Sequence, residues 1–279
     1  MQAILKRWEL GVEVVVQNGA LIEAKDYSGC TPLQLAIDAH HVASVKFLPE
    51  KGAPIEKKDD PSYMPFWQAL LNSYKPMIEI LLEKGASIEQ QNSDGYTPLI
   101  WALKNDRAAS DHASSPDLVS FLLEKNAPTD AKDALGFAPL FLAIKKRRLW
   151  EIKKFLDKGA AIEERHSSGL TPLLLALKYG DLATTHDLLK RGAKIEARDD
   201  NGVTPLLWAV QHKLLPVVEF LVEEGAEVDV KDNDGQTPMR LASQRRHEGP
   251  PGDSRTIEWE SISLPLTKTV KRSFPTQPS

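Results

Sequence analysis

The sequence predicts an all-α solenoid of stacked helix–turn–helix units, and two recurring patterns support this fold class. A six-residue pattern of the form Thr-Pro-Leu-x-x-Ala recurs along the chain, with starts 33 residues apart and one gap of 41. A second marker, Gly-Ala, keeps the same spacing. A fixed period of this length is typical of repeat proteins, in which each unit buries its apolar face against its neighbours.

Each copy of the longer pattern predicts the start of a first helix. Threonine can cap a helix through its hydroxyl group, and proline suits the first helical position because its missing amide hydrogen is not needed there. The copies start at Thr31, Met64, Thr97, Ala138, Thr171, Thr204 and Thr237.

The Gly-Ala marker predicts the end of a second helix in each unit. Apolar residues at helical spacing precede it, as in residues 77–82 and 217–221. Glycine then accepts the left-handed conformation that ends many helices. The marker begins at Gly19, Gly52, Gly85, Asn126, Gly159, Gly192 and Gly225.

The period and the pattern together resemble the ankyrin-repeat family, whose signature is Thr-Pro-Leu-His-x-Ala. The resemblance covers residues 1–247 and implies projecting β-hairpin turns between the repeats. At the position of the family's histidine this chain has Gln34, Trp67, Ile100, Phe141, Leu174, Leu207 and Arg240. Five of these are apolar, so we expect a drier core in which packing replaces the histidine's hydrogen bonds.

The same marks divide the chain into segments. Residues 1–25 form a partial N-terminal repeat, which is either a cap or the continuation of an array that begins upstream of Met1. The repeats in 26–247 are 26–58, 59–91, 92–132, 133–165, 166–198, 199–231 and a partial unit at 232–247. The insertion in 92–132 is a polar loop at 105–116. Residues 248–279 are rich in Pro, Ser and Thr and are expected to form a flexible tail.

Composition narrows the classes of partner. The chain has 35 basic and 39 acidic residues, a net charge of -4, so we expect neither nucleic acid nor a membrane as a partner. The lone Cys30 favours a reducing compartment, and no secretory signal or membrane-spanning run is evident. We expect a cytoplasmic monomer, with the nucleus as an alternative because residues 145–148 are similar to a nuclear-import cluster.

The sequence contains none of the standard catalytic, nucleotide or metal motifs, so we expect no enzyme, no cofactor and no metal site. The seven histidines are scattered over different repeats, and loop or solvent-facing roles are expected for them. Adjacent His40 and His41 lack the further ligands that zinc requires.

Two rows of charge emerge when equivalent hairpin positions are aligned. An acidic row contains Glu23, Glu56, Glu89, Asp130, Glu163, Glu196 and Asp229. Two residues later a mostly basic row contains Lys25, Lys58, Gln91, Lys132, Arg165, Arg198 and Lys231. We favour ion pairs that link neighbouring hairpins, worth about 0 to 1 kcal/mol each. The alternative is a striped surface for a charged partner.

The family resemblance implies that partners touch the hairpins, where the residue before each pattern reads Cys30, Tyr63, Tyr96, Phe137, Leu170, Val203 and Gln236. Exposed aromatic residues are common anchors of binding surfaces, although residues here also cover helix ends. We expect a partner-binding surface on one concave side, with lysines flanking the hairpin residues. Its predicted members are Tyr63, Tyr96, Phe137, Leu170, Lys104, Lys145, Lys146 and Lys178.

The sequence therefore predicts a non-catalytic scaffold or adaptor that binds another protein through a concave face and hairpin tips. One alternative is a regulatory or targeting segment of a larger multidomain protein, suggested by the abrupt first repeat. Another is a ubiquitin-ligase substrate adaptor. Residues 261–266 faintly resemble the recruiting box of such ankyrin proteins, but the helix with Leu-Cys expected before that box is missing.

Overall fold

A computed structural model describes residues 1, 4, 9–56, 63–105 and 118–246. The chain divides into two compact units, residues 1–128 (unit 1) and 129–279 (unit 2), which are described separately below. The predicted tail, nearly all of the predicted 105–116 loop, and Lys58 lie outside the described residues.

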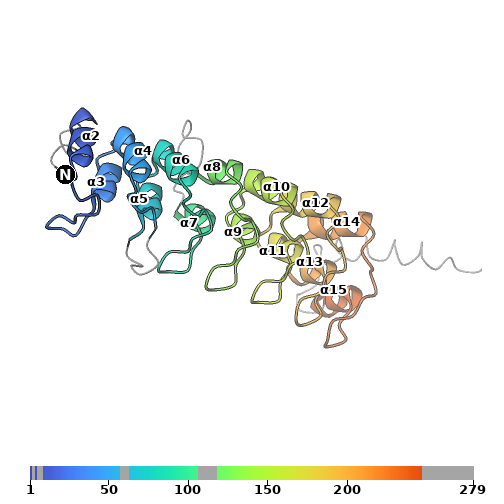
Figure 1. Cartoon of the computed structure of the whole chain (residues 1–279). Coiled ribbons are helices and arrows are strands. Elements are labelled where there is room, and N and C mark those ends of the chain that lie inside the picture. The colour runs from blue at the N-terminus through green and yellow to red at the C-terminus, as the bar shows by residue number, and fades with distance from the viewer. Residues whose placement is uncertain (2–3, 5–8, 57–62, 106–117, 247–279) are drawn as a thin grey trace, which may run out of the picture. The chain divides into compact units, whose positions relative to one another are not determined.

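Unit 1 consists of helix pairs that follow one another along the chain (Figure 1). Its helices are α2 (Glu9–Gln17), α3 (Pro32–Asp38), α4 (Val42–Glu50), α5 (Pro65–Leu71), α6 (Lys75–Glu83), α7 (Pro98–Asn105) and α8 (Leu118–Glu124). Helix α3 packs against α4 and against α5 of the next pair, while α4 packs against α2 and α6. The first helices α3, α5 and α7 lie on the side of the projecting loops.

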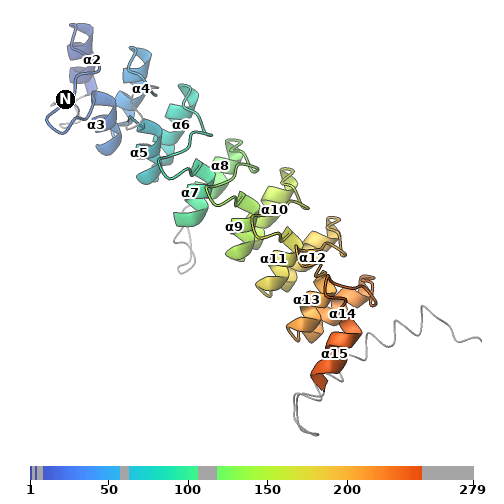
Figure 2. The ribbon, with the colours of Figure 1, turned by 90° about the horizontal axis from the view of Figure 1, so that it is seen from below.

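Unit 2 repeats this arrangement. Its helices are α9 (Pro139–Lys145), α10 (Leu149–Asp157), α11 (Pro172–Lys178), α12 (Leu182–Lys190), α13 (Pro205–Gln211), α14 (Leu215–Glu223) and α15 (Pro238–Arg246). The first helices α9, α11, α13 and α15 pack one against the next, and each of the first three also packs against its own second helix. Figure 2 shows these first helices side by side.

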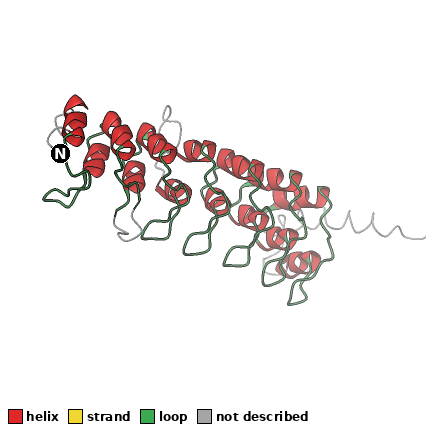
Figure 3. Ribbon diagram, viewed as in Figure 1, coloured by secondary structure: helices red, strands yellow, loops and turns green. Residues whose placement is uncertain are grey.

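The described residues contain helices and loops and no strand (Figure 3). The all-α fold of repeated helix pairs predicted from the sequence is therefore confirmed. The loops between repeats close as hairpins through backbone hydrogen bonds, for example from the Asp199 amide to the Val203 carbonyl at 3.1 Å.

The predicted start of the first helices is visible in detail at α13. Thr204 has an extended backbone, and its hydroxyl accepts a hydrogen bond from the Leu207 amide at 3.4 Å. Pro205 occupies the first turn. Met64 and Ala138 begin α5 and α9 without a side-chain cap, so proline alone marks the start of those helices.

The five apolar positions are buried as expected, but Trp67 still donates a hydrogen bond from its Nε1 atom to the Gln90 carbonyl at 3.2 Å, so packing alone replaces the histidine at only the other four. The side chains that replace the family's histidine are at most 4% exposed in these copies: Trp67, Ile100, Phe141, Leu174 and Leu207. Gln34 instead keeps a hydrogen-bonding role, because its Oε1 accepts from the Thr31 amide at 3.0 Å. Arg240, in the last copy, is exposed.

Each well-described hairpin is closed by a side chain at one repeated position. The Asp199 carboxylate accepts hydrogen bonds from the amides of Asn201 at 2.9 Å and Val203 at 2.8 Å. Gly202 next to it has a φ of +74°, and a Cβ atom there would lie 2.4 Å from the Asn233 side chain. The same two-amide contact recurs at Asp26, Asn92, Asp133 and Asp232.

At three described positions the acidic row links neighbouring hairpins through hydrogen bonds to the backbone. Glu163 Oε1 accepts from the Lys194 amide at 2.7 Å, and Glu196 Oε1 accepts from the Glu227 amide at 2.8 Å. In unit 1, Glu56 makes the equivalent bond to the amide of Ser87 at 2.8 Å. The carboxylate of one repeat therefore supplies the acceptor that a backbone amide at the turn of the next repeat requires.

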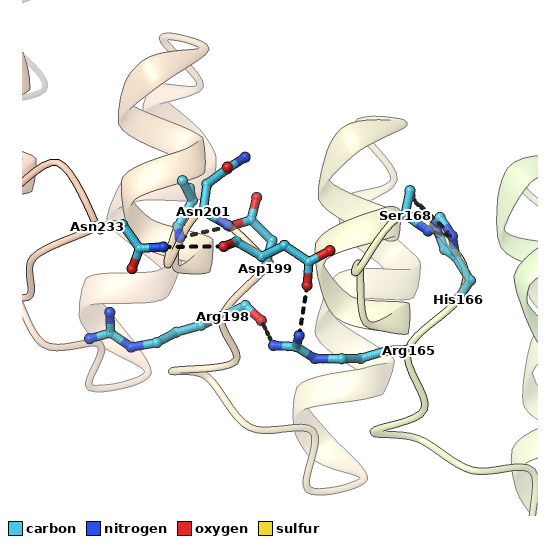
Figure 4. A network of polar contacts seen from close by, with 9 residues as sticks. Arg165, His166, Ser168, Arg198, Asp199, Asn201 and Asn233 are labelled. Carbon is cyan, nitrogen blue, oxygen red and sulfur yellow. Dashed lines mark hydrogen bonds and ion pairs between the residues drawn. The ribbon is translucent and has the colours of Figure 1, made fainter.

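The basic row adds a second link in unit 2 (Figure 4). Arg165 donates to the Arg198 carbonyl and pairs with Asp200 at 3.0 Å. Arg198 in turn donates to the Lys231 carbonyl at 2.7 Å. We call these contacts of Glu163, Glu196, Arg165 and Arg198 the hairpin ladder. Part of the ion pairing expected from the sequence is therefore present, at Arg165 and between Lys132 and Glu164 at 2.6 Å.

Core packing predicts a large effect for truncation of α13. Leu206 is 0% exposed, so Leu206→Ala should lower the free energy of unfolding by about 2 to 5 kcal/mol through lost burial and a cavity. Leu182→Ala is the matched control, because Leu182 is 46% exposed on α12 and its loss should change stability by about 0.5 kcal/mol or less. Urea unfolding followed by circular dichroism compares the two, and equal effects would refute the assignment of Leu206 to the core.

The hairpin ladder predicts a stabilising substitution at Glu196. Its Oε2 atom is buried without a hydrogen-bond partner, and burial raises the pKa of this carboxyl, a shift that the Glu227 amide opposes. A raised pKa in the folded state means that the contribution to stability is complete at low pH and is lost as pH rises through the folded pKa. Glu196→Gln keeps the acceptor oxygen and removes the charge, so it should raise the urea midpoint at pH 7.

Glu163→Gln is the control for this substitution, since Glu163 makes the same contact one repeat earlier. The gain should be confined to Glu196→Gln and should shrink as the pH is lowered to about 4, near the ordinary pKa of a glutamate. A midpoint that falls at pH 7 for Glu196→Gln would show that its ionised form is the favoured one.

Candidate functional site

The predicted partner-binding residues are divided between the two units, and each group is considered within its own unit. Unit 1 contains Tyr63, Tyr96 and Lys104. Unit 2 contains Phe137, Leu170, Lys145, Lys146 and Lys178.

Two of the predicted hairpin anchors are buried, which corrects the expectation that this row is exposed. Tyr63 is 3% exposed, and its hydroxyl donates to the Pro54 carbonyl at 2.7 Å. Leu170 is 8% exposed. Burial of the tyrosine leaves no hydrogen bond unsatisfied, because its hydroxyl donates to a backbone carbonyl. The leucine side chain has no polar group that needs a partner. Both residues therefore support the fold and offer little surface to a partner.

Tyr96 and Lys104 are brought together in unit 1. The Lys104 Nζ atom lies over the Tyr96 ring, 4.0 Å from its centroid, and both residues are partly exposed. Tyr96 belongs to the hairpin, where its amide donates to Asn92 Oδ1 at 2.9 Å, and Lys104 lies in the last turn of α7. The stacking joins the hairpin and the helix end of one repeat into a continuous surface.

Sequence reasoning missed a tryptophan beside this pair. Trp101 is partly exposed and lies one turn before Lys104 on α7, so the two side chains share a helix face. Its ring meets the buried Trp67 edge to face, with centroids 6.2 Å apart. Leu71, at the end of α5, is 62% exposed. The sequence did contain a signal for this residue: the position before the repeated alanine is Trp101 in this copy of the pattern.

In unit 2, Phe137 is held by a histidine. Phe137 is partly exposed, and its ring lies 5.0 Å from the His166 ring, centroid to centroid. His166 also meets the buried Phe141 edge to face at 5.2 Å. The Phe137 amide donates to Asp133 Oδ1 at 2.9 Å, so the backbone of this residue is fixed by its own hairpin.

His166 occupies the hairpin position that is Asp or Asn in the other described copies. Its Nδ1 accepts from the Ser168 amide at 2.9 Å, as a carboxylate would (Figure 4). Burial lowers the pKa of His166, and the positive charge of Lys178 lowers it further. Both effects disfavour the protonated form of His166.

The lysines predicted for unit 2 reach solvent. Lys145 ends α9, Lys146 follows it, Lys178 ends α11, and all three are exposed. Lys145 and Lys178 occupy the same position of successive repeats. Sequence reasoning missed Trp208 on α13, a partly exposed ring that packs against His212 with centroids 4.0 Å apart.

Two features are absent from the described residues. Within them, no group of three or more His, Cys, Asp or Glu side chains is arranged to hold a metal ion. Among the same residues, no helix is both long and apolar enough to cross a membrane.

Comparison with known proteins gives a matching family model and a similar solved structure. A family model described as ankyrin repeats (3 copies) matches residues 106–199 and 178–249. Among solved structures, the ankyrin repeat domain of Bcl-3, described as a unique member of the IkappaB protein family, matches with a TM-score of 0.63 and 24% sequence identity. That match covers 76% of this chain and 94% of the Bcl-3 chain. A search of curated proteins gave no significant match.

The environment of His166 predicts that unit 2 weakens in mild acid. The pKa of His166 is lowered in the folded state, so the unfolded chain takes up this proton first as pH falls below about 6.5. The contribution to stability is complete above that pH and is lost towards the folded pKa. His166→Asn, which introduces the residue found at Asn92, should reduce the loss of stability between pH 7.5 and pH 5.5. Urea midpoints of the two proteins at both pH values provide the measurement, and identical slopes would show that His166 does not govern this response.

Proposed function

This chain belongs to the ankyrin-repeat family, and we propose that it is a non-catalytic scaffold or adaptor that binds another protein through its hairpins and first helices. Ankyrin repeats are generally protein–protein interaction modules, and their fold is typically non-enzymatic. The proposal concerns which face is used and which residues anchor the partner. The regulatory-segment and ubiquitin-ligase alternatives remain open, and residues 261–266 lie outside the described structure.

One observation carries the proposal: the stacking of Lys104 on Tyr96 at 4.0 Å. A partly exposed tyrosine loses little conformational entropy on binding and offers both an apolar ring and a hydroxyl group. The lysine fixes one face of the ring and adds a positive charge beside it. With Trp101 on the same helix, this arrangement has the aromatic and basic composition of binding hot spots.

Unit 2 supports the same face independently. Phe137 is partly exposed and held by its stacking on His166, while Lys145, Lys146 and Lys178 extend from the ends of the first helices. A stable interface buries about 1,200 to 2,000 Å² in total, which requires contacts from several repeats. We therefore place partner contacts on the hairpin and first-helix side within each unit, with Tyr96 as the anchor in unit 1 and Phe137 as the anchor in unit 2.

The proposal predicts that loss of the Tyr96 ring weakens partner binding. Proteins captured from native cells by the parent chain should bind Tyr96→Ala about thirtyfold more weakly, which matches an anchor worth about 2 kcal/mol. Quantitative mass spectrometry of the captured proteins measures the ratio, and Phe137→Ala tests unit 2 in the same way.

Tyr27→Ala is the matched control, because Tyr27 is a fully exposed hairpin tyrosine in another repeat of unit 1. Circular dichroism must show that each variant remains folded. If neither anchor variant changes capture, while substitutions on the second helices such as Trp150→Ala abolish it, the binding face has been placed on the wrong side.

A further inference from the structure

Positive charge is concentrated on the first helices of unit 2 and on the turns after them. Segments 138–148, 171–181, 204–214 and 237–246 together contain nine lysines and arginines and one acidic residue, Asp181. The corresponding segments of unit 1, 31–41, 64–74 and 97–105, contain one basic and one acidic residue. The whole chain has a net charge of -4, so this basic side of unit 2 is a local feature.

The first helices that carry these basic residues pack against one another in a row. Helices α9, α11, α13 and α15 pack in succession, and Figure 2 shows them side by side. Lys145 and Lys178 are exposed at the C-terminal ends of α9 and α11, and Arg240 is exposed in the first turn of α15. Lys145 and Lys178 therefore occupy equivalent places on two helices that pack against each other.

The needs of the fold account for only part of this charge. One lysine near a helix C-terminus complements the helix dipole by about 0.3 to 1 kcal/mol. Arg147 donates to the Gly180 carbonyl at 2.8 Å, and Arg148 pairs with Glu151 at 3.1 Å. Lys145 and Lys178 lie in the last turns of α9 and α11, as Lys104 does in α7, whereas α3 and α5 end at Asp38 and Leu71 without a positive charge. The fold of a repeat therefore does not require a lysine at this position.

Apolar side chains accompany the exposed lysines. Phe137 lies in the hairpin just before α9, is partly exposed and stacks on His166. Trp208, also partly exposed, lies on α13 next in the row. A ligand on this side would therefore meet positive charges and aromatic rings together.

We propose that the basic side of unit 2 binds an acidic, extended segment of a partner protein. This inference rests on the proposed function and adds the chemistry of the partner. Carboxylates of the segment pair with Lys145 and Lys178, and an apolar side chain between them contacts Phe137 or Trp208.

The spacing of the repeats sets the spacing of the acidic residues. Packed helices lie about 8 to 10 Å apart, and a chain in the polyproline II conformation advances about 3.1 Å per residue with about three residues per turn, so every third side chain lies on the same side. Lys145 and Lys178 occupy equivalent positions of adjacent repeats. A segment in this conformation that runs along the row therefore presents a carboxylate to each of these two lysines when its acidic residues are about three positions apart.

A nucleic acid is the less favoured ligand for this side. The exposed Asp200 and Asp234 on neighbouring hairpin tips repel any anionic ligand, and they repel a nucleic acid more strongly because it carries a phosphate at every nucleotide. Lysine and arginine side chains interleaved with partly buried rings suit a peptide whose own side chains alternate in polarity. A nucleic acid nevertheless provides a clear contrasting probe.

The test uses three fluorescein-labelled peptides of about twelve residues, long enough to span about four repeats. Glutamate recurs at every second, third or fourth position, with tyrosine and leucine between. Fluorescence anisotropy with the full chain should show binding, strongest for the third-position peptide and at least about tenfold weaker for its glutamine counterpart, because the lost pairs are charge-assisted. A single-stranded oligonucleotide of equal charge should bind more weakly.

Charge reversal locates the site. Lys145→Glu with Lys178→Glu should weaken peptide binding at least about tenfold, because both contacts become repulsive. Lys153→Glu with Lys190→Glu is the matched control, since both lysines are exposed on second helices of unit 2 and the change in net charge is equal. This control should retain most of the affinity, and circular dichroism checks that both variants remain folded.

Three results would overturn the inference: no peptide binds, the two double variants lose affinity equally, or the oligonucleotide binds more tightly than the peptides. These failures are distinct from failure of the proposed function. That proposal fails when capture of the native partner is insensitive to Tyr96→Ala and Phe137→Ala, whatever the peptides do.

Discussion

The structure depends first on one constraint: each helix pair completes the burial of its apolar residues against the pairs beside it. The repeated first-helix positions are almost completely buried, with Leu33, Leu99 and Leu206 at 0% exposure. No single repeat could bury these residues alone. The second constraint, satisfaction of the hairpin backbone, follows from the first, because stacking brings each hairpin close enough to its neighbour for Glu163 and Glu196 to reach the next amide.

These two requirements decide which hairpin residues are available to a partner. The repeated Asp or Asn closes the hairpin, and the acidic and basic rows connect it to the next one. A partner can still reach the residue before a first helix where that residue is partly exposed, together with the exposed end of the helix. Tyr96 with Lys104, and Phe137 stacked on His166, occupy such places.

The helices could be predicted from the sequence because their signals are local. The Thr-Pro pair both caps and starts a helix, as at Thr204 and Pro205, and needs no knowledge of neighbours. Exposure within the candidate site could not be predicted in the same way. Tyr63 and Tyr96 occupy the same repeat position, yet Tyr63 finds the Pro54 carbonyl and is buried, whereas Tyr96 lies beneath Lys104 and remains partly exposed. That difference arises from residues at other positions: Pro54 in the repeat before Tyr63, and Lys104 in the same repeat as Tyr96.

The net charge of the chain also says little about the charge that a partner meets on one side of it. The total of -4 argues against an anionic partner, but it averages over groups with different environments. The carboxylates of Glu163 and Glu196 accept backbone amides in the hairpin ladder, so part of their charge is already compensated within the fold. Lys145 and Lys178 end their helices in solvent. Because screening confines the effect of an exposed charge to about 8 Å, a partner on the first-helix side senses these lysines and not the total for the chain.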